Sequence, residues 1–148
     1  MEVSTFLDFV TVRFKEKNWR VTAGVRNVSS ILARQNKFYS VMDIEYRLVQ
    51  MGRSIDTVTI YRILEKLNDV GLVNEFESKW HHETDPDNAL KGHYLICDKT
   101  GWAEEIHLDY FSTIAKQLAK EKGFLLKEVK MAFVGTSDKN RRPEDLSS

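Results

Sequence analysis

The feature that most constrains the fold is a helical pattern that leads directly into two strand-like runs. Apolar residues recur with helical spacing at Ile60, Ile63, Leu64 and Leu67. Asp56 precedes them and can cap a helix through its side-chain oxygen, and Gly71 follows them and can end a helix in a left-handed conformation. The next segment, "LVNEFESKWHHET" at 72–84, is rich in strand formers and is interrupted near Ser78, which predicts a β-hairpin.

Three more amphipathic patterns precede this helix. They cover residues 4–17, the segment around 25–32 and residues 41–51, each with apolar residues along one side. Three short helices, a fourth helix with a polar front face and a hairpin, in that order, are typical of a winged helix-turn-helix domain. We therefore predict such a domain over residues 1–84, with the fourth helix entering the major groove of DNA.

The second half of the chain is organised differently, and the whole chain is predicted to be an α+β protein. Segment 85–92, "DPDNALKG", combines Pro, Gly and turn formers and is predicted to be a hinge. Residues 93–136 are predicted to form a small α/β dimerisation domain, because a unit of this size buries little core alone. The polar tail, 137–148, is predicted to be disordered.

The predicted elements of this second domain are, in order, strand, strand, helix and strand. They are strands at 93–97, 102–108 and 124–135 and a helix at 109–123. Along the helix Phe111, Ile114 and Leu118 recur with helical spacing, so we expect them to face inward.

The surface left on the predicted fourth helix carries groups that suit DNA. Thr57, Thr59, Tyr61 and Arg62 gather at its N-terminal end. Threonine bonds phosphates and base edges, and arginine can bond guanine with two hydrogens. Arg20 lies in an extended stretch upstream and suits the narrow minor groove of A·T-rich DNA. The alternative interpretation of both elements is a solvated surface.

Charge and composition set the broad class. The chain has no net charge, but residues 1–66 contain 11 Lys and Arg against 7 Asp and Glu, an excess of four positive charges. That excess is also within the ordinary scatter of a small domain. The sequence has no apolar run long enough to span a bilayer, and its single cysteine, Cys97, cannot form an internal disulfide. A soluble cytoplasmic protein without a membrane partner is expected.

The chain resembles the ferric uptake regulator family of metal-responsive repressors. The resemblance is carried by "WRVT" at 19–22, by "IDTVTIYRILEKLNDVGLV" at 55–73 and by "HYLIC" at 93–97 followed by Gly101. It implies a homodimeric repressor that binds double-stranded DNA at an A/T-rich inverted repeat. It also implies that Tyr61, Arg62, Thr57 and Thr59 read the major groove and that Arg20 contacts the minor groove.

The sequence contains only some of the metal ligands that the resemblance implies. Family members commonly carry a Cys-x-x-Cys pair for structural zinc, but here Thr100 replaces the second cysteine, so a structural zinc site made of four cysteines within one chain is impossible. Phe38 or a neighbour replaces one expected histidine, and Val129 replaces another. Histidine and carboxylate groups suit zinc, iron or manganese. The remaining candidate ligands for a regulatory metal are His82, Glu83, His93 and His107. In a strand, His81 and His82 would point to opposite faces. The alternative interpretation of these residues, which we favour, is a solvated hinge.

Two other functions are compatible with parts of the sequence. A winged-helix module that has lost DNA reading and acts through protein contacts would explain the missing ligands, although it has no special need for both Tyr61 and Arg62. A metallohydrolase would need three fixed ligands and an open position, and the chain has no His-Glu-x-x-His helix and no recognisable triad spacing. We therefore do not expect an enzyme.

Overall fold

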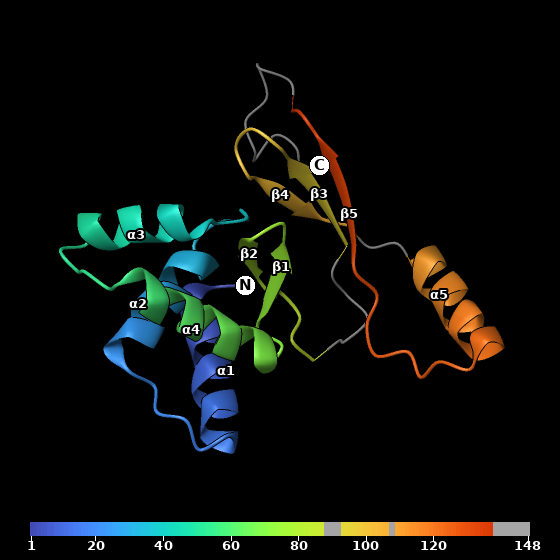
Figure 1. The fold of residues 1–148 in the computed structure, drawn as a ribbon, viewed down its shortest axis with the longest axis horizontal. Helices are drawn as coiled ribbons and strands as arrows, with labels where there is room; N and C mark the ends of the chain where they lie inside the picture. The colour runs from blue at the N-terminus through green and yellow to red at the C-terminus, as the bar shows by residue number, and fades with distance from the viewer. Residues whose placement is uncertain (88–92, 107–108, 138–148) are drawn as a thin grey trace. The chain divides into compact units, whose positions relative to one another are not determined.

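The computed structural model describes residues 1–87, 93–106 and 109–137. The chain divides into two compact units, Met1–Pro86 and Asp87–Ser148, each containing elements of its own (Figure 1). The division falls within the segment predicted to be a hinge. Most of that segment, and the predicted disordered tail from residue 138 onward, lie outside the described residues.

The first unit contains four helices followed by a hairpin, which is the predicted order. The elements are α1 (Val3–Glu16), α2 (Ala23–Ala33), α3 (Val41–Gln50), α4 (Thr57–Asp69), β1 (Val73–Phe76) and β2 (Lys79–His82). Helices α2, α3 and α4 are each capped by a side-chain oxygen, from Thr22, Ser40 and Asp56, respectively. Their apolar sides meet in one buried cluster that also takes in α1 and the hairpin.

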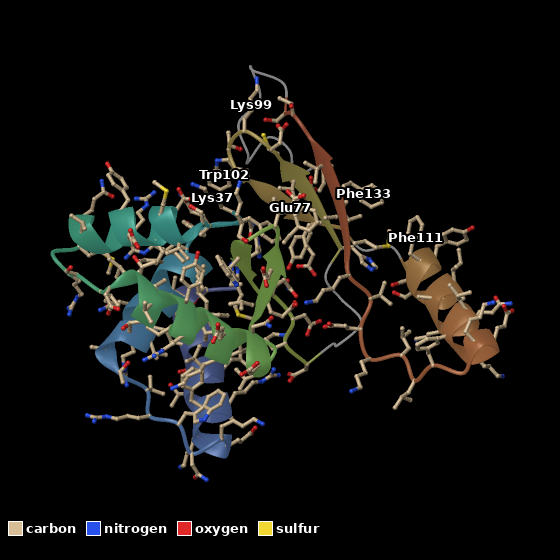
Figure 2. The ribbon with its side chains drawn as sticks, viewed as in Figure 1. Lys37, Glu77, Lys99, Trp102, Phe111 and Phe133 are labelled. Atoms are coloured by element: carbon tan, nitrogen blue, oxygen red, sulfur yellow. The ribbon has the colours of Figure 1, made fainter. Side chains whose placement is uncertain are left out.

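The hairpin is the wing of a winged helix-turn-helix domain. Its strands are antiparallel, with Val73 opposite His82. The two turn residues, Glu77 and Ser78, have φ of 49° and 60°, the left-handed values that a tight two-residue hairpin turn requires; Glu77 is labelled in Figure 2. The backbones of Tyr39 and Trp80 exchange two hydrogen bonds of 2.8 Å. The segment before α3 is therefore joined to the wing by an isolated antiparallel β-bridge.

Arg13 of α1 fixes the end of α4 to the end of the first unit. Its Nη1 donates to the carbonyl oxygen of Val70 at 2.7 Å, and its Nη2 donates to that of Pro86 at 3.0 Å. Val70 is the C-cap of α4, where backbone carbonyls lack partners within the helix. Gly71 follows with φ of +73°, which confirms the predicted helix end.

The described residues of the second unit form a three-stranded sheet and one helix. Its elements are β3 (His93–Cys97), β4 (Ala103–Glu105), α5 (Asp109–Lys122) and β5 (Met131–Gly135). The strand order is β4-β3-β5, with β3 antiparallel to β4 and parallel to β5. The aromatic rings of Phe111 and Phe133, both labelled in Figure 2, have centroids 6.5 Å apart.

Three predictions about this unit need correction. The last strand begins at Met131 rather than at 124, and the second spans only Ala103–Glu105. No residue of α5 is buried, and Ile114 and Leu118 are 44% and 53% exposed, so the prediction that they face inward is wrong for the single chain. The physical reason is size, because three short strands cannot cover a 14-residue helix as well as their own faces.

Candidate nucleic-acid interface

Helix α4 separates an aliphatic side from a polar side. Four of its aliphatic residues are 0% to 5% exposed, and they are Ile60, Ile63, Leu64 and Leu67, whereas Val58 in the first turn is 57% exposed. Burial of this side leaves Thr57, Tyr61 and Arg62 on the exposed part of the helix, and Thr59 is half-buried. The helix N-terminus, with its own partial positive charge, lies at the same end. This end of the helix therefore presents a guanidinium, a phenol and hydroxyl groups to solvent.

The two threonine hydroxyls are engaged within the unit. Thr57 Oγ1 donates to Glu45 Oε1 of α3, and Thr59 Oγ1 donates to Asp56 Oδ1. A hydroxyl that donates its hydrogen keeps lone pairs that can accept from a base amino group. The hydrogen bond from Thr59 and the nearby Arg62 lower the pKa of Asp56. Sequence reasoning missed Glu45, because this contact joins residues 12 apart in the chain.

An aromatic contact holds Tyr61 in place. Its ring lies edge-on to that of Trp80 in the wing, with centroids 5.8 Å apart. Trp80 is buried at 7% exposure, whereas Tyr61 is 43% exposed. One side of the phenol ring therefore rests on the domain while the remainder is available for contact. Trp80 was not among the sequence-predicted site residues; only its aromatic character within a strand could have pointed to it.

Arg20 is exposed in the segment between α1 and α2. Its neighbour Trp19 packs edge-on against Phe14, with ring centroids 5.4 Å apart. Lys66 of α4 places its Nζ 5.5 Å from the centre of the Trp19 ring. Trp19 thus anchors the basic segment to the core and to the exposed side of α4 at once.

The candidate metal ligands are distributed over both units of the chain. His82 and Glu83 are in the first unit, His93 is in the second, and His107 lies outside the described residues. Glu83 is 6% exposed, and its carboxylate accepts hydrogen bonds from Asn74 Nδ2 at 2.7 Å and from the backbone N–H of Asp85 at 3.0 Å. Within the described ranges, no three His, Cys, Asp or Glu side chains are close enough together to hold a metal ion.

His81 and His82 correct another expectation. Their rings do not point to opposite faces of the strand but stack, with centroids 4.6 Å apart and planes 13° from parallel. The ring of His81 is held against the backbone of the next residue, where Nδ1–H donates to the carbonyl oxygen of His82 at 2.7 Å. Two phenylalanines flank the pair: the Phe38 ring is tilted against His81 with centroids 5.1 Å apart, and the Phe6 ring is edge-on to His82 with centroids 5.8 Å apart. Phe38, which stands where the resemblance leads us to expect a histidine ligand, is thus part of an aromatic cluster.

Burial controls the protonation of both histidines. Removal from water lowers the pKa of His81 to about 3, with a smaller contribution from His82. Burial likewise lowers the pKa of His82 to about 4, although a hydrogen bond to the backbone of Leu32 partly opposes it. Both rings are therefore neutral parts of the core at physiological pH.

Hydroxyl groups surround Cys97 in the described part of the second unit. Burial opposes ionisation of the thiol, but hydrogen bonds from Ser137 and Thr100 outweigh it and lower the pKa of Cys97 to about 6. The Cys97 Sγ and Ser137 Oγ atoms are 3.2 Å apart. Hydroxyl groups are poor ligands for a structural zinc ion, which takes Cys and His. Thr100 and Phe38 therefore stand where the resemblance leads us to expect a cysteine and a histidine, and neither side chain is a zinc ligand.

The four helices and the wing define the protein as a winged-helix protein of the DNA-binding type. The chain belongs to the ferric uptake regulator family, whose family model matches residues 16–134. This assignment confirms the resemblance and the α+β fold class, and it places the chain among regulators of transcription. No curated protein sequence matches the chain.

Several solved structures share the fold. A zinc uptake regulator in complex with zinc and DNA is 21% identical, with 93% of each chain covered and a TM-score of 0.76. The Vibrio cholerae ferric uptake regulator is 22% identical over 84% of this chain and 96% of its own, with a TM-score of 0.62. The Helicobacter pylori ferric uptake regulator, described with three functional metal binding sites, is 16% identical, covers 100% of this chain and 96% of its own and has a TM-score of 0.64.

No helix in the described part of the chain is both long enough and apolar enough to cross a membrane.

Proposed function

We propose that the protein is a homodimeric, sequence-specific DNA-binding repressor that reads an A/T-rich inverted repeat. The observation that carries the proposal is the division of α4, which buries its aliphatic side and leaves Tyr61 and Arg62 exposed beside the helix N-terminus. An α-helix fits the major groove, and these residue types recognise base edges and phosphates. Membership of a family of regulators supports the same function.

Each predicted contact residue has a role in this proposal. Arg62 bonds a guanine edge or clamps a phosphate, and Tyr61 adds a ring contact and a hydroxyl. Thr57 and Thr59 accept hydrogen bonds from bases and fix the register of the helix. Arg20 enters the minor groove, where narrow A·T-rich sequence attracts arginine.

The second unit supports the homodimer. In the described residues its helix and the following segment expose a series of large apolar side chains, namely Tyr110, Ile114, Leu118, Phe124 and Leu125. Contiguous apolar surface of this kind marks an interaction site. A symmetric partner would cover it, and two-fold symmetry matches the two halves of an inverted repeat.

The function is tested by selection from a pool of random duplexes with the full-length protein. We expect enrichment of an A/T-rich inverted repeat, with an affinity that falls steeply as salt rises, because bound phosphates release counterions. Binding that is equally strong to every sequence would show that the protein contacts DNA only by electrostatic attraction to the phosphates. A pool that returns no enriched sequence, with or without added divalent metal, would contradict the function.

Removal of metal is expected to leave specific DNA binding unchanged. Phe38 belongs to the aromatic cluster, and both carboxylate oxygens of Glu83 accept hydrogen bonds within the first unit, so this domain is held together without a metal. The measurement is the dissociation constant for the selected duplex before and after chelation, alongside metal analysis of the purified protein. Loss of binding on chelation, with recovery on addition of Zn²⁺, Fe²⁺ or Mn²⁺, would show that a metal is required and that the remaining candidates, including His93 and His107, need to be tested as ligands.

A further inference from the structure

A hollow lies between helices α2 and α3, which pack on each other in the first unit (Figure 1). Its volume is about 390 Å³, within the range of about 300–1,000 Å³ that is usual for small-molecule sites. The polar lining residues are Arg34, Gln35, Tyr39, Arg47 and Gln50, and the apolar ones are Ile31 and Met51. We call this hollow the α2–α3 pocket.

Hydrogen-bond donors dominate the polar lining of the pocket. The guanidinium groups of Arg34 and Arg47 carry only donors, and each can hold a carboxylate or a phosphate through two parallel bonds. Tyr39 is 2% exposed, and its hydroxyl donates to Gln35 Oε1 at 3.3 Å. The amide N–H groups of Gln35 then remain as donors. Such a lining suits a ligand with negatively charged oxygen atoms.

Both arginines act on the same part of the pocket. Burial raises the pKa of Tyr39, and the positive charges of Arg47 and Arg34 oppose that rise, so both lie within electrostatic reach of the phenol. Asp43 adds to the rise, but its carboxylate accepts a hydrogen bond from the backbone N–H of Ser40 at 3.0 Å, at the other end of α3. Neither guanidinium forms an ion pair among the residues that the structure describes. The pocket therefore concentrates two positive charges.

The helix ends account for each arginine separately. Arg34 is the C-cap of α2 and Arg47 is in the last turn of α3, where the helix dipole stabilises a positive charge. That effect favours an arginine at each helix end, but it does not require the two to line one hollow together with the amides of Gln35 and Gln50. The convergence of these four side chains is the observation that points to a ligand.

The pocket is on the side of α3 that faces away from the helix proposed to read DNA. Glu45 accepts the hydrogen bond from Thr57 of α4, so its side of α3 faces that helix. Arg47 follows Glu45 by two positions, which corresponds to about 200° around a helix with 3.6 residues per turn. The pocket is therefore directed away from the N-terminal end of α4, and its position favours a free anion over a phosphate of DNA.

The size and the lining of the pocket together define the class of ligand. Ile31 and Met51 add apolar surface, which suits a carbon chain better than a bare inorganic ion. A guanidinium from each helix suits one acidic group at either end of such a chain. We propose that the α2–α3 pocket binds a small organic anion with two acidic groups, held between Arg34 and Arg47.

The experiment titrates the full-length chain with malonate, succinate and glutarate at constant ionic strength and without DNA. Binding is followed by the NMR resonances of the Tyr39 ring and of the arginine side-chain N–H groups. Butanoate, which has the chain length of succinate but only one acidic group, is the matched control ligand. We expect saturable binding of at least one diacid, about 10-fold or more tighter than that of butanoate, because butanoate lacks the second charge-assisted contact.

Three variants test the residues that carry the proposal. Arg34→Gln and Arg47→Gln each remove one guanidinium and keep a polar side chain, and both positions are exposed. Arg26→Gln is the matched control, because it removes an exposed guanidinium of α2 that does not line the pocket. We expect each pocket variant to weaken binding of the diacid by about 10-fold to 100-fold, and the control to leave it unchanged.

Several outcomes would overturn the inference. One is the absence of saturable binding for all three diacids. Another is equal weakening by Arg26→Gln, which would show only a general attraction of anions to a basic surface. Inorganic phosphate that binds as tightly as the diacids would contradict a ligand with two acidic groups. Because the titrations contain no DNA, failure of the proposed DNA function would leave their result unchanged, and failure of the pocket would leave the DNA function standing.

Discussion

Lowering the pH from 7 to 5 is expected to reduce the free energy of unfolding of the first unit by roughly 4 kcal/mol, about 2 kcal/mol for each of two buried histidines. In the unfolded chain, His81 and His82 have ordinary pKa values of about 6.5 and become protonated over this range. In the folded unit, burial holds their pKa values at about 3 and about 4, so the rings stay neutral. The unfolded state therefore binds more protons, and stability falls as the pH falls.

The pH window follows from the same values. The contribution of each neutral histidine is fully present above pH 6.5 and is lost progressively below it, down to about pH 4 for His82 and about pH 3 for His81. Urea unfolding at pH 7, 6 and 5, followed by far-UV circular dichroism, measures the change. Carboxylates also titrate near the lower limit, so His82→Phe serves as the matched variant and should lose about half of the decline between pH 7 and pH 5.

Phe suits this comparison because it keeps the aromatic volume beside Phe6. If the variant is too unstable to study, NMR titration of the unaltered protein gives the same information from the imidazole C–H resonances. Two rings that remain unprotonated at pH 5 in the folded state would agree with the prediction. Titration of either ring near pH 6.5 in the folded protein would contradict it.

Arg62→Ala is expected to weaken binding to the selected duplex by about 10-fold to 100-fold, corresponding to loss of a bidentate base contact of about 1–3 kcal/mol. Arg62 is exposed on α4 beside the helix N-terminus, and Ile63 next to it is buried, so the backbone at this position is fixed by the core. The side chain can be removed without loss of packing. The measurement is the dissociation constant for the selected duplex and for a scrambled duplex at one salt concentration.

Two comparisons identify the kind of contact that Arg62 makes. Arg62→Lys keeps the charge but not the planar pair of donors, so it should recover affinity for the scrambled duplex more than for the selected one. Lys99→Ala removes one positive charge from an exposed turn of the second unit and should change little. Equal weakening on both duplexes by Arg62→Ala would indicate a phosphate contact. Unchanged affinity on both would show that this helix does not read DNA.

The first unit could be predicted in detail because its signals are local. The caps at Ser40 and Asp56, the helical spacing of the apolar residues and the glycine at position 71 each act within a few residues of the element they define. The order of four helices and a hairpin then left few alternatives. The buried side of α4 follows from the same periodicity.

The contacts around the site could not be predicted in this way. The bond from Thr57 to Glu45 and the ring contact between Tyr61 and Trp80 join separate elements, and no sequence period encodes them. The stack of His81 on His82 departs from the alternation of a regular strand, and the ring of His81 bonds the backbone carbonyl of His82. The exposed side of α5 was misassigned for another reason, since helical spacing shows which residues share a face but not which molecule covers that face.

The uncovered side of α5 has a consequence for the amount of protein that a cell can maintain. A newly made chain without a partner presents Leu118, Phe124 and Leu125, all more than half exposed, to chaperones and proteases. Assembly of the proposed homodimer would hide this surface, so paired chains would outlast single ones. Turnover would then remove surplus unassembled chains first. The abundance of the regulator would therefore be limited by the same apolar surface through which its chains pair.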